Sequence, residues 1–366
     1  MHIALFLPDL NGGGAERVML TLAKYFAAQG HRVDMVLARA EGALLPLLSP
    51  TVRLVDLQSG LRNWGLAGLA VSATLRLAAY LRREKPDALL STLTGANLVA
   101  VIASKLAGRV GRLVLREAAT LKNLKGHLRL WLMQWLYPLA DAIVVLNEVM
   151  RQEMISVVGI LPEKIVCISN PVDIDFIRSQ AQINLDHPWF LPGNPPVIIG
   201  VGRLSIQKDF KTLINAFAEL RLRGTDARLV ILGDGPLKIE LENLVKYLKL
   251  ETEIIFPGFD NNPYRWLIRS KLFVLSSLWE GQPNAVLEAL ALGKPVVITN
   301  YDSSVQAFSK NKSVTIVPPV SITAMAAAII KTLDQRTFPS VDASTDFDFS
   351  LPKLLYEKIL STGRNL

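Results

Sequence analysis

Cysteine and histidine are scarce in this chain of 366 residues, which has one cysteine and four histidines. The single cysteine, Cys167, excludes an internal disulfide framework, and the scattered histidines do not give the ligand spacing of a zinc site. We therefore expect a reducing compartment, no metal and no bound cofactor.

Long apolar runs are also lacking. The amino terminus, MHIALFLPDL, carries no basic leader and its apolar stretch stops at Pro8, which indicates a first strand and not a signal peptide. The uncharged stretch 88–104 is interrupted by serine, threonine and asparagine and falls short of a comfortable membrane span. We expect no transmembrane helix and a cytoplasmic protein.

Acidic residues are scarce in the first part of the chain. Residues 1–170 contain 19 Lys/Arg and 12 Asp/Glu, which leaves 21 and 20 of the totals of 40 and 32 for the remainder. Nearly all of the net charge of +8 therefore lies in residues 1–170. A basic half suits nucleic acid, an anionic lipid surface or a diphosphate substrate, and composition does not separate these three.

Apolar residues are abundant and make up half of the chain, enough for two cores. Short apolar runs alternate with helical patterns on both sides of a turn at Asn170 and Pro171, which predicts two α/β domains with parallel sheets. In the first half the expected strands are 3–7, 33–37, 88–91, 112–115 and 142–146. In the second half they are 197–201, 228–232, 253–256, 272–275 and 295–299.

The most informative segment is EGQPNAVLEALALGKPV, residues 280–296. Glu280 lies in a Gly/Pro-rich loop after a buried strand, and Glu288 lies on the helix that follows. A helix start offers backbone N–H groups to an anion, and two carboxylates can engage a ligand with two hydroxylated ends. A nucleotide sugar has such ends, the hexose and the ribose. The alternative is that both glutamates are solvated and flank an ordinary helix.

Two other segments suit phosphate. Gly12, Gly13 and Gly14 precede a helix, where glycines allow close backbone approach and the helix start attracts anions. Arg203 and Lys208 follow the first strand of the second half and suit a diphosphate that gains charge as a glycosidic bond breaks. Taken alone, the glycines fit a tight turn and the two cations fit a surface pair.

These segments occur together, and in the same order, in one family. GGAER at 13–17, GRLSIQK at 202–208 and the segment 280–296 resemble the motifs of retaining GT-B glycosyltransferases of the family-4 type. Further elements of that family are similar to NPVD at 170–173, LGDGP at 232–236 and FPGF at 256–259. The resemblance covers essentially the whole chain.

The resemblance implies an α/β fold of two Rossmann-like, doubly wound domains that face a cleft, with a C-terminal helix crossing back to the first domain. The apolar helical pattern of 347–360 fits that helix. We expect an acceptor-side domain of residues 1–170 plus 346–366 and a nucleotide-sugar-binding domain of residues 171–345.

The resemblance also implies the catalytic residues Glu280, Arg203 and Lys208. Glu280 would bind the hydroxyls of the sugar, and the two cations would contact the diphosphate of the donor. Glu288 would bind the ribose. The backbone from Gly281 to Asn284 would help to cradle the phosphates.

In the first domain the resemblance places Gly13 and Gly14 near the donor phosphates and the acceptor. Many family members have a histidine near the sugar, but no histidine occurs between positions 31 and 127. The corresponding region reads LREAATLKN, in which Arg116 and Glu117 are candidate substrate-binding residues. Alternatively, they form a charged pair that supports the strand end.

A basic, tryptophan-containing stretch suits the acceptor side. Seven basic residues and one acid lie between Lys105 and Arg129, and residues 128–138 read LRLWLMQWLYP. Trp131 and Trp135 fall on one helical face, and basic residues around such a face suit an anionic membrane surface beside a lipid-linked diphosphate. The alternative is a core-facing helix, since tryptophans also fill cores. The basic excess favours the membrane.

The sequence therefore predicts a retaining, metal-independent glycosyltransferase that moves a hexose from a nucleotide sugar, with a UDP-sugar favoured. The expected acceptor is a polyprenyl-diphosphate-linked or other surface glycan, reached from the inner face of the cell membrane. A GT-B-fold nucleotide-sugar epimerase would use the same donor site without an acceptor surface. A non-catalytic basic protein that binds lipid or nucleic acid would leave the paired glutamates unexplained. We expect no nucleic-acid partner, because no aromatic-interleaved basic platform occurs elsewhere.

Overall fold

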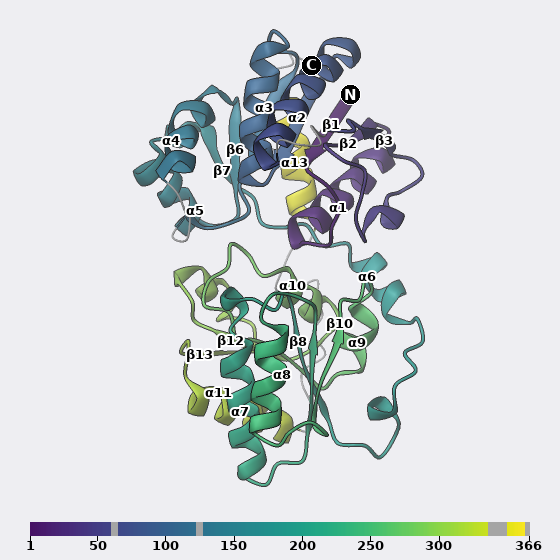
Figure 1. Ribbon diagram of the computed structural model, residues 1–366, viewed down its shortest axis with the longest axis vertical. Helices are drawn as coiled ribbons and strands as arrows, with labels where there is room; N and C mark the ends of the chain where they lie inside the picture. Colours follow the sequence, from purple (N-terminus) through teal and green to yellow (C-terminus); the bar gives the residue numbers. More distant parts are fainter. Residues whose placement is uncertain (60–64, 122–126, 336–349, 363–366) are drawn as a thin grey trace. The chain divides into compact units, whose positions relative to one another are not determined.

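The structure is a computed structural model in which residues 1–59, 65–121, 127–335 and 350–362 are described. The chain divides into two compact units, one of Met1–Val172 with Phe349–Leu366 and the other of Asp173–Asp348. Each unit is built around one parallel sheet with helices on both faces (Figure 1). The predicted boundary between residues 345 and 346 lies outside the described residues.

The sheet of the first unit has seven parallel strands in the order β3-β2-β1-β4-β5-β6-β7. The strands are β1 (His2–Leu7), β2 (Arg32–Leu37), β3 (Arg53–Asp56), β4 (Ala88–Thr92), β5 (Arg112–Arg116), β6 (Ala142–Val145) and β7 (Ile165–Cys167). The direction of winding reverses between β1 and β4, which is the doubly wound arrangement predicted from the sequence.

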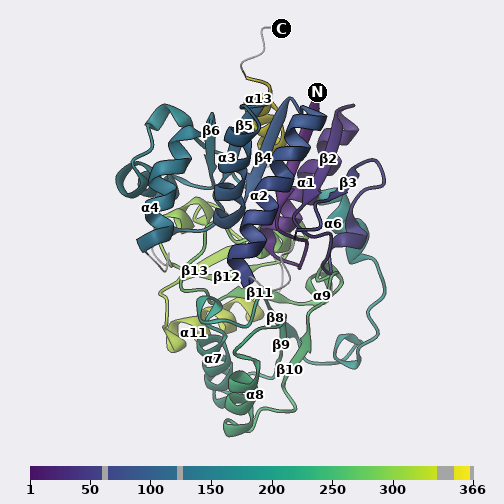
Figure 2. The same cartoon turned by 45° about the horizontal axis from the view of Figure 1, so that its top comes forward.

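Different helices cover the two faces of this sheet. One face packs against α2 (Gly65–Glu84), α3 (Thr94–Leu106), α4 (His127–Leu136) and α5 (Glu148–Glu153), which bury residues such as Leu77, Ala100 and Met133. Figure 2 shows α2, α3 and α4 on this side. The other face packs against α1 (Gly14–Ala28) and α13 (Leu351–Ser361).

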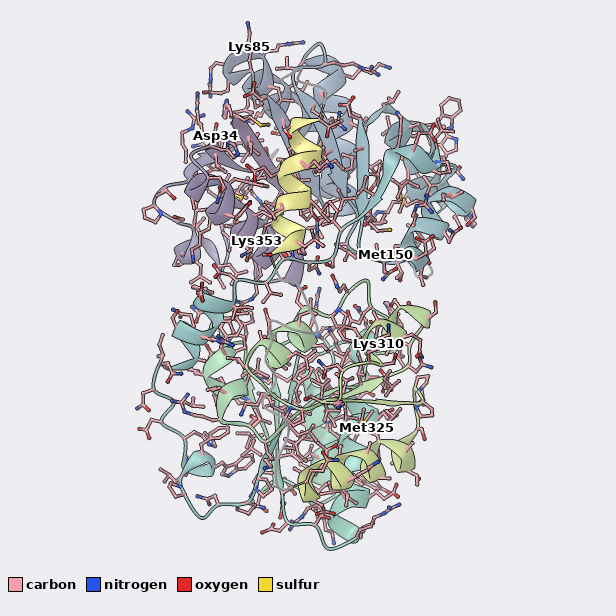
Figure 3. All side chains as sticks on the ribbon, turned by 180° about the vertical axis from the view of Figure 1, so that it is seen from behind. Asp34, Lys85, Met150, Lys310, Met325 and Lys353 are labelled. Carbon is pink, nitrogen blue, oxygen red and sulfur yellow. The ribbon has the colours of Figure 1, made fainter. Side chains whose placement is uncertain are left out.

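The C-terminal helix α13 belongs to the first unit, which confirms the predicted crossing back. Tyr356, Ile359 and Leu360 are buried in the same core as strands β1, β2 and β4. Glu357 accepts hydrogen bonds from the hydroxyl of Tyr25 at 3.0 Å and from Nε2 of His31 at 2.9 Å. Figure 3 shows this helix in yellow, with Lys353 labelled near one end.

The second unit has six parallel strands in the order β10-β9-β8-β11-β12-β13. They are β8 (Val197–Val201), β9 (Arg228–Leu232), β10 (Ile254–Gly258), β11 (Leu272–Leu275), β12 (Val296–Thr299) and β13 (Val314–Val317). The helices are α6 (Ile174–Ala181), α7 (Phe210–Leu222), α8 (Lys238–Tyr247), α9 (Tyr264–Arg269), α10 (Asn284–Ala291) and α11 (Ile322–Asp334). The order reverses between β8 and β11, so this unit is doubly wound as well.

Three strands, β3, β7 and β13, were not predicted. All three lie at an edge of a sheet and have three or four residues. β3 begins with Arg53 and ends with Asp56, so it lacks the continuous apolar run that marks a central strand.

The uncharged stretch 88–104 forms β4 and most of α3 and is not one long helix. No helix in the described parts of the chain is long and apolar enough to cross a membrane.

Candidate active site

The residues implied by the second-half motifs gather at the carboxyl ends of β8 and β11. The loop after β8 contains residues 202–209, and the loop after β11 contains residues 276–283. Because β8 and β11 are neighbours at the point where the sheet reverses its winding, the two loops emerge side by side. In doubly wound sheets this point is where ligands bind.

The carboxylate of Glu280 connects these two loops. Its Oε1 lies 2.6 Å from Nζ of Lys208 and accepts a hydrogen bond of 2.6 Å from the hydroxyl of Ser277. Its Oε2 accepts a hydrogen bond of 3.2 Å from the side-chain amide of Gln207. Only 7% of Glu280 is exposed, so solvent screens this ion pair weakly.

The backbones of the same loops are fastened to each other and to the next strand. The N–H of Leu278 donates to the carbonyl of Gln207 at 2.8 Å, and the hydroxyl of Ser276 donates to the carbonyl of Lys208 at 2.7 Å. At the end of β12, the hydroxyl of Thr299 donates to the carbonyl of Ser277 at 2.6 Å. The loops are therefore held in position by groups other than the ion pair.

Glycines allow the close approach of backbone that this arrangement requires. A Cβ atom on Gly202 would lie 2.9 Å from Cε of Lys208, so a side chain there would displace the lysine. In the loop after β9, a Cβ atom on Gly233 would lie 2.0 Å from the carbonyl oxygen of Gly202. A Cβ atom on Gly235 would lie 2.4 Å from the carbonyl oxygen of Leu204. The glycines of LGDGP shape the site without contributing a functional group.

The other predicted residues of this unit lie around the same loops. Arg203 is exposed and directly follows Gly202 after β8. Gly281 is buried in the loop, and Asn284 is the first residue of α10, whose N-cap, Pro283, supplies no capping side chain. Glu288 lies one turn further along the helix and is half-buried.

Four residues near these loops were not identified from the sequence. Gln207 and Ser277 bind the Glu280 carboxylate, and the hydroxyl of Tyr264 donates to Oε1 of Glu288 at 3.2 Å. Tyr301 follows β12, and its pKa is raised by burial and, to a smaller extent, by the charge of Glu280. The available signal was proximity in sequence, since Gln207 precedes Lys208 and Ser277 stands three residues before Glu280.

In the first unit, the glycine loop lies after β1 as predicted. Gly13 is the N-cap of α1, and Gly14 is its first residue. A Cβ atom on Gly13 would lie 2.3 Å from Oε2 of Glu16, so the missing side chain makes room for this carboxylate. Burial raises the pKa of Glu16, while the N–H groups at the helix start oppose that shift. The helix start therefore already has a carboxylate beside it.

Arg116 is the last residue of β5 and is 1% exposed. Its Nη1 donates to the hydroxyl of Thr92 at 2.9 Å, and its Nη2 donates to Oδ1 of Asn170. Asn170 lies three residues before Asp173, where the second unit begins. Arg116 thus ties two strand ends to the segment that leaves this unit.

Glu117 is also 1% exposed but has different partners. Its carboxylate accepts hydrogen bonds from the hydroxyl of Thr94 at 3.0 Å and from that of Tyr137 at 2.6 Å. Burial raises its pKa, and these two hydrogen bonds oppose the shift. Arg116 and Glu117 therefore do not form the pair considered above. Because both side chains are buried, a role in supporting the strand ends is favoured over direct contact with substrate. Their predicted binding of substrate stays a prediction.

The tryptophans of α4 project from the surface of the first unit. Trp131 is 52% and Trp135 is 67% exposed, with ring centroids 6.1 Å apart, and Leu128 on the same helix is 69% exposed. Met133 is the buried residue of this helix. The two rings therefore do not fill the core. Lys122 and Lys125 of the basic stretch lie outside the described residues.

The four described ranges contain no group of three or more histidine, cysteine, aspartate or glutamate residues placed to hold a metal ion.

Comparisons with known proteins agree with the motifs and the fold. The family model described as Glycosyltransferase Family 4 matches residues 12–176, and that described as Glycosyl transferases group 1 matches residues 182–343. The chain is similar to a Campylobacter jejuni enzyme, N-acetylgalactosamine-N,N'-diacetylbacillosaminyl-diphospho-undecaprenol 4-alpha-N-acetylgalactosaminyltransferase. The two are 30% identical over 310 residues, which cover 82% of this chain and 81% of the relative.

Two further similarities extend over most of the chain. The UDP-Gal:alpha-D-GlcNAc-diphosphoundecaprenol alpha-1,3-galactosyltransferase of Escherichia coli is 27% identical, with 83% of this chain and 79% of the relative covered. The crystal structure of Anabaena HepE in complex with UDP-glucose has a TM-score of 0.81 at 20% identity, with 98% and 99% of the two chains covered.

The shared fold is GT-B, a class defined by two Rossmann-like domains. Within this class, the chain belongs to the group 1 glycosyltransferases and is a glycosyltransferase.

The buried state of Glu117 predicts a pH-dependent stability difference. A carboxyl whose pKa is raised in the folded protein contributes stability below its ordinary value of 4.5 and loses it as the pH rises toward the folded value. Glu117→Gln removes this titration. Urea unfolding should therefore show that the variant gains free energy of unfolding relative to wild type between pH 5 and pH 8.

Glu148→Gln provides the control, because Glu148 is exposed and its pKa is lowered, so it is already ionised above pH 5. Its difference from wild type should stay constant over that range. A constant difference for Glu117→Gln as well would contradict the raised pKa of the buried Glu117 carboxyl.

Proposed function

We propose that this glycosyltransferase moves a hexose from a nucleotide sugar, with a UDP-sugar favoured, to a polyprenyl-diphosphate-linked or other surface-glycan acceptor. The observation that carries the proposal is the contact of Lys208 with Glu280 at the carboxyl ends of β8 and β11. It brings together the cation proposed for the diphosphate and the carboxylate proposed for the sugar.

The charges of this site suit the departure of a nucleoside diphosphate. Arg203 and Lys208 provide two positive charges after β8, where negative charge develops on the leaving diphosphate. We propose that these cations provide the neutralisation that a divalent metal would otherwise supply. Retention of the anomeric configuration is proposed on the family resemblance.

The two carboxylates suit the two sugar rings of such a donor. Glu280 is nearly buried and held by three donors, which is the rigidity that orientation of a hexose requires. Glu288 lies on α10 and is contacted by the hydroxyl of Tyr264, and we assign it to the ribose. The Gly281–Asn284 backbone at the start of α10 is assigned to the phosphates.

The acceptor is proposed from two independent observations. The names of the C. jejuni and E. coli relatives specify diphosphoundecaprenol-linked sugars as acceptors. In addition, α4 exposes Trp131 and Trp135 in a unit with excess positive charge, which suits peripheral binding to an anionic membrane. We therefore place the protein at the inner face of the cell membrane, in synthesis of envelope polysaccharide.

Replacement of Glu280 tests the proposed donor site. Glu280→Ala should lower kcat for sugar transfer by roughly a hundredfold or more, because a preorganised charged group at the reacting sugar is lost. Transfer is measured with radiolabelled UDP-sugars and a polyprenyl-diphosphate-linked glycan. Glu280→Ala also leaves Lys208 without its anionic partner. Glu280→Gln, which retains the shape of the side chain, should therefore be measured in parallel.

Glu251→Ala, at an exposed glutamate of the same unit, is the matched control and should transfer normally. Normal turnover by both Glu280 variants would refute the proposed site. Accumulation of an epimerised nucleotide sugar without transfer would instead support the epimerase.

Replacement of both tryptophans of α4 tests the membrane contact. Trp131→Ser with Trp135→Ser should reduce partitioning onto anionic vesicles by roughly a hundredfold, since burial of two half-exposed rings contributes about 3 kcal/mol. Nucleotide binding should not change.

The control is Leu222→Ser with Tyr247→Ser, which removes two side chains of the second unit that are 89% and 82% exposed. Sedimentation with vesicles containing anionic lipid provides the measurement. Equal partitioning of the tryptophan variant and wild type would exclude α4 from the membrane contact.

A further inference from the structure

Two neutral donors contact the carboxylate of Glu280 in addition to Lys208. The hydroxyl of Ser277 donates to Oε1, and the side-chain amide of Gln207 donates to Oε2. The two donors come from different loops and reach different oxygens of the carboxylate. Together they define the orientation of the carboxylate plane.

Both donors are themselves fixed by neighbouring groups. Ser277 is completely buried, and its carbonyl accepts a hydrogen bond of 2.6 Å from Thr299. The side-chain amide nitrogen of Gln207 also donates to the carbonyl of Trp279 at 2.9 Å. The backbone carbonyl of Gln207 accepts a hydrogen bond from the N–H of Leu278 at 2.8 Å. Neither donor depends on the nearby ammonium group to keep its position.

Lys208 differs because the proposed function gives it a second anion to serve. Its Nζ lies 2.6 Å from Oε1 of Glu280, and its ammonium group has three N–H donors. A donor diphosphate attracts the same ammonium group, and this attraction grows as negative charge develops on the leaving group. The lysine then divides its interaction between carboxylate and phosphate when the orientation of the sugar matters most.

We infer that Ser277 and Gln207 are positioning residues, which hold the carboxylate of Glu280 toward the sugar while Lys208 serves the diphosphate. The inference rests on the proposed function and deepens it. Neither residue is assigned a contact with substrate, and both act through Glu280. Their removal should therefore affect recognition of the sugar and not recognition of UDP alone.

The test uses the full chain with Ser277→Ala and Gln207→Met, each of which removes one donor. Dissociation constants are measured for UDP, UDP-glucose, UDP-galactose and UDP-N-acetylgalactosamine. Each variant should bind UDP like wild type and bind the best UDP-sugar roughly tenfold or more weakly, as expected when a hydrogen bond to a charged group is lost. Ser277→Thr, which restores the hydroxyl, should recover affinity for the sugar.

Ser270→Ala is the matched control for the loss of a buried serine hydroxyl. Ser270 is 2% exposed and donates to the carbonyl of Trp266 at 2.8 Å, without contact with Glu280. This variant should bind UDP and UDP-sugars like wild type. A second control places Ser277→Ala in a Glu280→Ala background, where it should cause no further loss of affinity for the UDP-sugar.

Four outcomes would overturn the inference. Unchanged affinity for the UDP-sugar would show that the two donors are dispensable. Equal losses for UDP and the UDP-sugar, or an additive loss in the Glu280→Ala background, would indicate a general structural role. Absence of binding of every nucleotide to wild type would contradict the proposed function itself and the inference with it.

Discussion

The candidate site is centred on one ion pair, between Lys208 and Glu280, whose residues are 72 positions apart in the chain. The pair forms because β8 and β11 are neighbours in the sheet, so the loops after these strands meet at one edge. Its side chains are only 17% and 9% exposed, which limits screening by solvent. A diphosphate and a sugar bound there would each meet one member of the pair.

In the first unit, which has a similar sheet, the charged residues at the strand ends have a structural role. These residues, Arg116 and Glu117, are buried and hold neighbouring segments together. The unusual feature of its surface is α4, where two tryptophans are exposed. Tyr137 connects the two features, because it directly follows α4 and donates to Glu117. The buried network therefore fixes the end of the helix proposed to meet the membrane.

Local sequence patterns predicted the central strands and the C-terminal helix, because each depends on a continuous apolar pattern. The doubly wound order of the two sheets and the return of that helix to the first unit were implied by the family resemblance. The edge strand β3 lacks a continuous apolar pattern, because Arg53 and Asp56 stand at its two ends. The partners of Glu280 were not predicted, since the bond from Gln207 to Glu280 depends on the order of strands in space. The sequence also did not decide whether Trp131 and Trp135 lie in the core or at the surface, because the apolar pattern of α4 does not show which side of the helix packs inward.

Replacement of Arg203 tests whether the loops after β8 and β11 bind the diphosphate of a nucleotide. This residue is exposed, so Arg203→Met should leave the Tm of the protein without ligand unchanged. We expect UDP to raise the Tm of the wild-type protein, because a ligand that binds the folded state stabilises it, and to raise that of the variant much less. An equal rise in Tm for both proteins, or no rise for wild type with UDP, GDP or ADP, would show that these loops do not bind the diphosphate.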